Sequence, residues 1–165
     1  MRDADAHAPV AGIPGDRHEH AVGLAFAHLN RRDRTVREVE RYLEAKGVDE
    51  PTAAAAIAEL VEQRYLDDRR YAELFAQDRR ALDGWGTERI ERRLREVGVP
   101  ADVIAGVLGG DDEHDELTAA LAVLEQRLTA PPVDERERTR ALGLLVRRGY
   151  ELEVAYDAVR AFERP

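Results

Sequence analysis

The sequence predicts an all-α protein built from three tandem three-helix repeats in an elongated, curved array. A short signature occurs three times, over residues 43–48, 94–99 and 145–150, and its glycine falls at 47, 98 and 149. Self-similarity at a fixed period is the usual sign of stacked supersecondary units. Aromatic residues make up only 5% of the chain, so we expect small units that gain stability by stacking rather than one large core. No segment shows the alternation of apolar and polar residues that is typical of a strand.

Each signature also predicts the end of a helix. Glycine adopts the left-handed backbone conformation without the steric cost that a Cβ atom brings. In a Schellman motif the residue that follows this glycine packs on the residue four positions before the glycine. The expected partners are Leu43 with Val48, Leu94 with Val99, and Leu145 with Tyr150.

The composition excludes several classes of function. The chain of 165 residues contains no cysteine and no serine, which rules out a disulfide framework, cysteine zinc ligands and a serine or cysteine nucleophile. No glycine-rich loop followed by lysine is present to hold phosphates. We find no secretion signal and no apolar run of membrane-spanning length, so we expect a cytoplasmic protein. We expect a binding protein, not an enzyme, with no cofactor and no metal ion.

The first repeat is expected over residues 19–65, after a disordered tail over residues 1–18. Apolar residues at helical spacing predict a first helix over residues 21–30. Thr35 and Glu38 form a capping box that opens a second helix, which ends at Gly47. Asp49 caps a third helix with Pro51 in its first turn, where a missing N–H does no harm.

The second repeat is expected over residues 66–109. Asp67 is the predicted N-cap of a helix that runs to about Leu82. Glycines at 84 and 86 end this helix, and Thr87 is expected to cap the next one. Trp85, between these glycines, is interpreted as a packing anchor in the turn rather than as a platform for a ligand. Pro100 begins the last helix of this repeat.

The third repeat is expected over residues 110–165. The acidic residues at 111–116 are interpreted as favourable charges at a helix start rather than as a metal site. Pro131 and Pro132 then interrupt the helical pattern, and Asp134 with Glu137 can start a helix that ends at Gly149. A last helix leads to Pro165.

The candidate partner-binding residues are arginines beside the apolar faces of these helices. The net charge is −9, yet every basic residue except Lys46 is arginine, which suits bidentate contact with phosphate or carboxylate groups. Neighbouring glutamates such as Glu38, Glu91 and Glu96 could instead neutralise these arginines as helical ion pairs. The candidates are Arg31, Arg32, Arg34, Arg37, Arg41, Arg79, Arg80, Arg89, Arg92, Arg93, Arg147 and Arg148. The residues assigned to the structural signature are Gly47, Asp67, Asp68, Trp85, Gly98 and Gly149.

Over residues 20–162 the sequence resembles the RecX family of regulatory proteins. The most specific matches are residues 65–68 with Tyr71 and Ala72, the turn over residues 84–86, and residues 94–99. Residues 145–150 resemble the end of the C-terminal helix of the family, and residues 30–35 resemble the turn of its first repeat. The sequence departs from the family pattern at Arg64, where a glycine is common, in its extra N-terminal tail and in its acidic balance.

The resemblance implies three tandem three-helix repeats and a regulator without enzymatic activity. Such a protein binds the RecA recombinase and the RecA–DNA filament, and it modulates, mainly by inhibition, ATP hydrolysis, strand exchange and filament stability. Its setting is DNA recombination, DNA repair and the SOS response. We expect a monomer with weak direct contact to DNA and none to a membrane. An independent DNA-binding helical module and a generic helical protein-interaction scaffold are the alternatives, but the net charge of −9 disfavours strong DNA binding.

Overall fold

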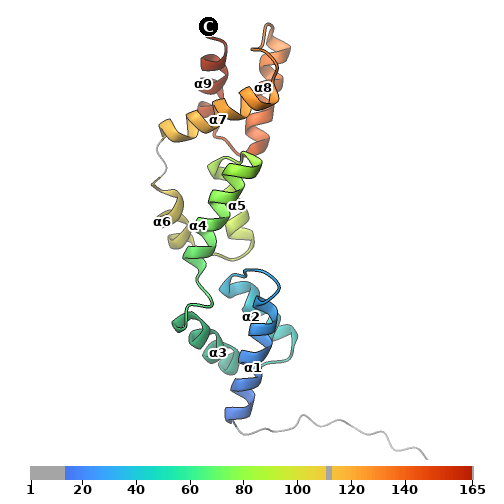
Figure 1. Cartoon of the computed structure of the whole chain (residues 1–165), viewed down its shortest axis with the longest axis vertical. Coiled ribbons are helices and arrows are strands. Elements are labelled where there is room, and N and C mark those ends of the chain that lie inside the picture. Colours follow the sequence, from blue (N-terminus) through green and yellow to red (C-terminus); the bar gives the residue numbers. More distant parts are fainter. Residues whose placement is uncertain (1–13, 111–112, 165) are drawn as a thin grey trace, which may run out of the picture. The chain divides into compact units, whose positions relative to one another are not determined.

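A computed structural model describes residues 14–110 and 113–164, and the all-α prediction is confirmed because these residues form helices and no β-strand. The chain divides into two compact units, one ending at Leu66 and one beginning at Asp67. Figure 1 shows the helices of the first unit in blue to blue-green and those of the second in green to red.

In the described part of the first unit, three helices surround an aliphatic core. The helices are α1 (Pro14–Leu29), α2 (Val36–Ala45) and α3 (Glu50–Glu62). Val39, Leu43 and Leu60 are completely buried in this core. Leu66, which we expected to open the second repeat, packs in the same core. Most of this core is aliphatic, as the low aromatic content of the sequence predicts.

Residues 14–18, which we expected in a disordered tail, belong to helix α1. Helix α1 begins at Pro14, so residues 14–18 are helical, whereas residues 1–13 lie outside the part of the chain that the structure describes. The helix extends in this direction because Pro is favourable in a first turn and Asp16 adds a favourable negative charge there. His18 also contacts Glu59 of α3, with 2.7 Å between the imidazole Nε2 and the carboxylate.

The described part of the second unit contains two further sets of three α-helices, each with its own core. Figure 1 shows these helices in green to red. The first set comprises α4 (Asp68–Asp78), α5 (Thr87–Glu96) and α6 (Ala101–Leu108), and its core includes the buried residues Ile90 and Leu94. The second set comprises α7 (Glu113–Arg127), α8 (Glu135–Arg148) and α9 (Leu152–Phe162), and its core includes Leu124 and Leu145. The prediction of three-helix repeats is therefore confirmed.

The three signatures end their helices as predicted. Gly47, Gly98 and Gly149 have φ angles of 78°, 87° and 87°. In each case the amide after the glycine donates to the carbonyl of the leucine five residues before, at 3.1, 3.0 and 3.2 Å. This bond and the left-handed glycine together define a Schellman motif.

A fourth helix end has the same geometry without glycine. Arg64 follows α3 with a φ angle of 60°, and it is the one positive-φ residue other than glycine among the described residues. The amide of Tyr65 donates to the carbonyl of Leu60 at 2.8 Å, which repeats the bond of the three signatures. A Cβ atom in this conformation costs about 1–2 kcal/mol.

Helix α4 does not continue to Leu82 as an α-helix. The α-helical hydrogen bonding ends at Asp78, and a wider π-helical turn, η1 (Arg79–Asp83), follows. Gly84 then ends the turn in the left-handed conformation, with a φ angle of 61°. The amide of Trp85 donates back to the carbonyl of Arg79 at 3.1 Å. The π-helical turn thereby places Trp85 beside the start of α5.

The N-terminus of α5 is bonded to the C-terminus of α8. The amide of Gly86 donates to the carbonyl of Arg148 at 2.8 Å, and the amide of Glu88 donates to the carbonyl of Gly149 at 3.1 Å. A Cβ atom on Gly86 would overlap the carbonyl of Gly149, and one on Gly149 would overlap Arg89. We call this contact the helix-end joint; it consists of residues 84–89 and 147–149. Free amides at a helix start and free carbonyls at a helix end satisfy each other there.

The expected cap of α5 by the Thr87 side chain is wrong. Gly86 is the N-cap and its helix start has no side-chain cap of its own. Instead the carboxylate of Glu116, in α7, accepts a hydrogen bond from the amide of Thr87 at 2.9 Å. Glu116 belongs to the acidic cluster that we placed at a helix start, and its carboxylate stabilises the start of a different helix.

Substitutions at two left-handed residues should change stability in opposite directions. Gly98→Val introduces a β-branched side chain at a φ angle of 87° and should lower the free energy of unfolding by about 2 kcal/mol or more. Arg64→Gly relieves the strain at 60° and should raise it by roughly 1 kcal/mol. Urea unfolding followed by circular dichroism measures both changes. Equal stability of Gly98→Val and the parent protein would contradict this reading of the helix ends.

Candidate partner-binding surface

The twelve candidate arginines fall into three groups of four. One group pairs with glutamates of neighbouring turns: Arg32, Arg34, Arg37 and Arg93. Another group lies at the helix-end joint or against its turn: Arg79, Arg80, Arg89 and Arg148. The remaining residues are exposed and form no ion pair with a carboxylate in the described part of the chain: Arg31, Arg41, Arg92 and Arg147.

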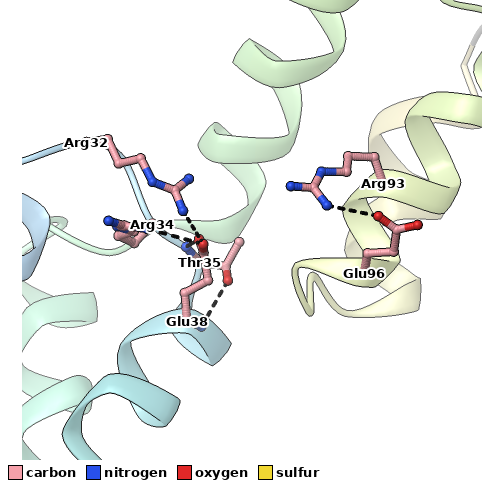
Figure 2. Close-up of polar contacts among 6 residues, drawn as sticks. All are labelled: Arg32, Arg34, Thr35, Glu38, Arg93 and Glu96. Atoms are coloured by element: carbon pink, nitrogen blue, oxygen red, sulfur yellow. Dashed lines mark hydrogen bonds and ion pairs between the residues drawn. The ribbon is translucent and has the colours of Figure 1, made fainter. Parts of the chain in front are cut away.

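Glu38 holds together the arginine-rich turn before α2. Its carboxylate accepts hydrogen bonds from Arg32 at 2.7 Å and from Arg34 at 3.5 Å, and also from the amide of Thr35 at 3.1 Å (Figure 2). The hydroxyl of Thr35 accepts from the amide of Glu38 at 3.2 Å, so the predicted capping box is confirmed. One glutamate therefore caps the helix and neutralises part of the positive charge of the turn.

Two further pairs are surface ion pairs that a partner can displace. Arg37 lies 2.9 Å from the carboxylate of Glu40. Arg93 lies 2.9 Å from the carboxylate of Glu96, and Figure 2 shows this second pair. The arginine and the glutamate of each pair are about half exposed. Such pairs contribute about 0–1 kcal/mol because water screens them. Their guanidinium groups therefore remain available to a phosphate or carboxylate of a partner.

The arginines at the helix-end joint bind backbone carbonyls. Arg89 donates to the carbonyl of Arg147 at 3.1 Å, and Arg148 donates to the carbonyl of Asp83. Arg79 pairs with the carboxylate of Asp83 at 2.5 Å. Arg89 therefore joins α5 to α8, and Arg148 joins α8 to the π-helical turn, whereas the Arg79–Asp83 pair lies within that turn.

Trp85 lies at the centre of this arrangement. Its ring packs against the core of α4–α6, edge-on to Phe75 with 6.1 Å between the ring centroids. The guanidinium of Arg89 lies 4.1 Å from the centroid of its ring, and that of Arg79 lies 5.8 Å away. The tryptophan thus packs in the turn and its ring is contacted by two cations.

His28 and Tyr42 form a second aromatic contact, in the first unit. Their rings are stacked with 3.9 Å between the centroids, and Lys46 lies 5.5 Å from the centroid of Tyr42. Burial lowers the pKa of His28 below its usual 6.5, and the positive charges of Arg34, Arg32 and Arg31 lower it further, although Glu38 acts in the opposite direction. The imidazole is therefore neutral near pH 7.

Two family models match the chain, described as the first and the second three-helix domain of RecX, over residues 21–60 and 67–108. A curated regulatory protein RecX from Mycolicibacterium vanbaalenii is 33% identical over 153 residues, which cover 88% of this chain and 83% of that protein. The chain belongs to the RecX family. A regulatory protein RecX from Amycolatopsis mediterranei is 31% identical and covers 89% of this chain.

Solved RecX structures share the fold. The crystal structure of RecX from Lactobacillus salivarius has a TM-score of 0.80 to this chain and covers 90% of it, with 16% sequence identity. A second RecX crystal structure has a TM-score of 0.73 over 90% of this chain. The family relatives are named regulatory proteins, and none of the described helices is long and apolar enough to cross a membrane.

Several residues of this surface were missed from the sequence. Arg127 lines a pocket beside Arg89, Arg147 and Arg148, and Glu116 caps α5 from 29 residues away. Neither has a local signal in the sequence, because both depend on how α7 packs in the second unit.

Tyr150 was expected only as a packing residue. Burial, with a smaller contribution from Glu116, raises its pKa to about 12, so its hydroxyl stays protonated.

The lowered pKa of His28 predicts a loss of stability in mild acid. Because the unfolded chain takes up this proton first, His28 does not affect stability well above pH 6.5, and it destabilises the folded state increasingly as the pH falls from 6.5 through the pKa of the folded state. His28→Gln should therefore lose less stability than the parent protein between pH 7.5 and 5.5. His28 accounts for at most one proton of the difference in proton uptake between the unfolded and the folded chain. Urea unfolding at both pH values, followed by circular dichroism, measures it; the same loss in both proteins would remove His28 from the account.

Proposed function

We propose that this chain is a non-enzymatic regulator that binds the RecA recombinase and its nucleoprotein filament. It modulates ATP hydrolysis, strand exchange and filament stability, mainly by inhibition, in recombination and DNA repair. The observation that carries the proposal is the match to a regulatory protein RecX over 88% of this chain, combined with the RecA function that membership of the family implies. The absence of serine and cysteine from the sequence agrees with a role in binding rather than in covalent catalysis.

The proposed contact surface consists of the exposed and weakly paired arginines. Arg31, Arg41, Arg92 and Arg147 present guanidinium groups without a carboxylate partner in the described residues. Arg37 and Arg93 can exchange their surface pairs for a partner's phosphate or carboxylate at little cost. A filament of protein and DNA offers both kinds of acidic group.

We propose that the protein is a cytoplasmic monomer that uses its three three-helix repeats as successive docking modules. The net charge of −9 repels bare DNA at long range, so direct contact with DNA is proposed to be weak. Contact with the filament then depends on the local arginine groups and on contacts to the RecA protein.

Addition of this protein to RecA, ATP and single-stranded DNA should lower the rate of ATP hydrolysis in a dose-dependent way. The rate of strand exchange should fall over the same concentration range. A coupled ATPase assay measures the first effect, and gel electrophoresis of the DNA products of strand exchange measures the second. Unchanged rates at saturating protein, with binding to bare duplex DNA instead, would favour an independent DNA-binding module.

We propose that the turn before α2 also belongs to the contact surface, through Arg31 and through Arg32 and Arg34, which can release Glu38 to bind the partner. This turn provides the sharpest test of the surface. Replacing Arg31, Arg32 and Arg34 by alanine should weaken binding to the RecA filament by about tenfold or more, because charge-assisted contacts are lost. The matched control replaces three exposed arginines outside the proposed surface, Arg69, Arg70 and Arg160, by alanine. Circular dichroism verifies that both variants are folded. Equal filament affinity of the two variants would exclude this turn from the interface.

A further inference from the structure

A pocket of about 320 Å³ lies beside the helix-end joint and is lined by four arginines. Arg89 comes from α5, Arg127 from the last turn of α7, and Arg147 and Arg148 from the last turn of α8. Trp85 and Asp83 complete the polar and aromatic part of the lining. The volume falls at the lower end of the range of about 300–1,000 Å³ that is typical of ligand sites.

The positive charge of this pocket is not compensated within the described residues. Asp83 is the one carboxylate in the lining, and it already pairs with Arg79, which lies outside the lining, at 2.5 Å. Arg89 and Arg148 each donate to a backbone carbonyl, which leaves their charge unbalanced. Arg127 and Arg147 are exposed and form no ion pair with a described carboxylate.

Four guanidinium groups around one small volume repel one another, which favours the uptake of an anion. The ends of α7 and α8 offset part of this repulsion, because a helix C-terminus carries partial negative charge. The contacts to backbone carbonyls fix Arg89 and Arg148 in position before any ligand arrives. Arg89 and Arg148 are therefore held in place before a ligand binds, whereas the exposed side chains of Arg127 and Arg147 can adjust to it.

We propose that this pocket binds a phosphate group. Each guanidinium carries five N–H donors, and Arg89 and Arg148 spend some of theirs on backbone carbonyls. A tetrahedral phosphate has acceptor oxygens that point in several directions, so it can bond guanidiniums from three helices at once. A single carboxylate presents two oxygens in one plane and is satisfied by one arginine fork. The geometry therefore matches phosphate better than an acidic peptide side chain.

The phosphate can come from a free ion or nucleotide, or from the backbone of a nucleic acid. Both sources present the same oxyanion to the four arginines. The site does not rest on the proposed regulation of RecA, because phosphate binding is measured with this protein alone. Arg147 belongs both to the pocket and to the proposed filament surface, but a failure to bind phosphate and a failure to inhibit RecA are read in separate assays and can be told apart.

Trp85 supplies the probe, because it is the only tryptophan of the chain and it lies in the pocket wall 4.1 Å from the guanidinium of Arg89. The full-length protein is titrated with inorganic phosphate, with a single-stranded oligothymidine and with an oligoglutamate peptide. We expect a saturable change of Trp85 fluorescence with phosphate and with the oligonucleotide, each displacing the other, and no saturable change with the peptide. Tighter binding of the oligonucleotide than of phosphate identifies the nucleic-acid backbone as the source, and the reverse order identifies a free phosphate.

The decisive variant is the double substitution Arg127→Gln and Arg147→Gln, because these exposed residues make no contact that the joint needs. It should weaken both phosphate ligands by at least about tenfold. The matched control, Arg70→Gln with Arg160→Gln, removes the same charge from exposed positions of the same unit outside the pocket and should change the affinity less than twofold. The single variants Arg127→Gln and Arg147→Gln should each give part of the loss, which guards against a folding defect in the double variant.

Three results would overturn the proposal. One is the absence of a saturable signal with either phosphate ligand. Another is an equal loss of affinity in the control variant, which would indicate attraction by net charge alone. The third is tighter binding of the oligoglutamate peptide than of both phosphate ligands, with loss in the pocket variant, which would assign the pocket to an acidic protein segment.

Discussion

The left-handed residue that ends a helix is the constraint on which this fold depends. Each set of three short helices has only a small aliphatic core, so the chain has to reverse within a few residues without losing backbone hydrogen bonds. The stops at Gly47, Gly98 and Gly149 achieve this with one repeated bond from the following amide to a buried leucine carbonyl. Gly149 has a second role, because its carbonyl accepts the amide of Glu88 and its lack of a side chain lets Arg89 approach.

The helix-end joint gives a structural reason for two motifs that are far apart in the sequence. The turn over residues 84–86 and the end of α8 over residues 147–149 form the two sides of one contact. Gly86 is required because a Cβ atom would overlap the Gly149 carbonyl. Arg89 and Arg148 reinforce the contact through backbone carbonyls. Residues that look like a charged binding motif in the sequence are therefore used in part to hold α5 and α8 together.

Local features of the fold could be predicted from the sequence, and contacts between distant segments could not. The capping box of Thr35 and Glu38, the Asp49 and Asp67 caps and the glycine stops are all formed within a few residues, so their spacing determines them. The cap of α5 by Glu116 was missed because it joins residues 29 positions apart, and the expected cap by Thr87 was wrong for the same reason. The π-helical turn was missed because Arg79 and Leu82 fit an α-helical pattern as well.

The candidate site shows the same division. That arginines carry the partner contacts stays a prediction, and the sequence could not separate the arginines that bind Glu38 or the helix-end joint from those that remain exposed. Arg127 entered the site only through the packing of α7 beside the ends of α5 and α8.

Amide hydrogen exchange at Gly86 and Glu88 tests the helix-end joint most directly. Both amides lie at a helix start, where intrahelical partners are absent, so any protection must come from the Arg148 and Gly149 carbonyls. The joint predicts that both amides exchange as slowly as the core amides of α5 and α8. Exchange at the rate of an unstructured loop would contradict the joint and the account of the two motifs that rests on it.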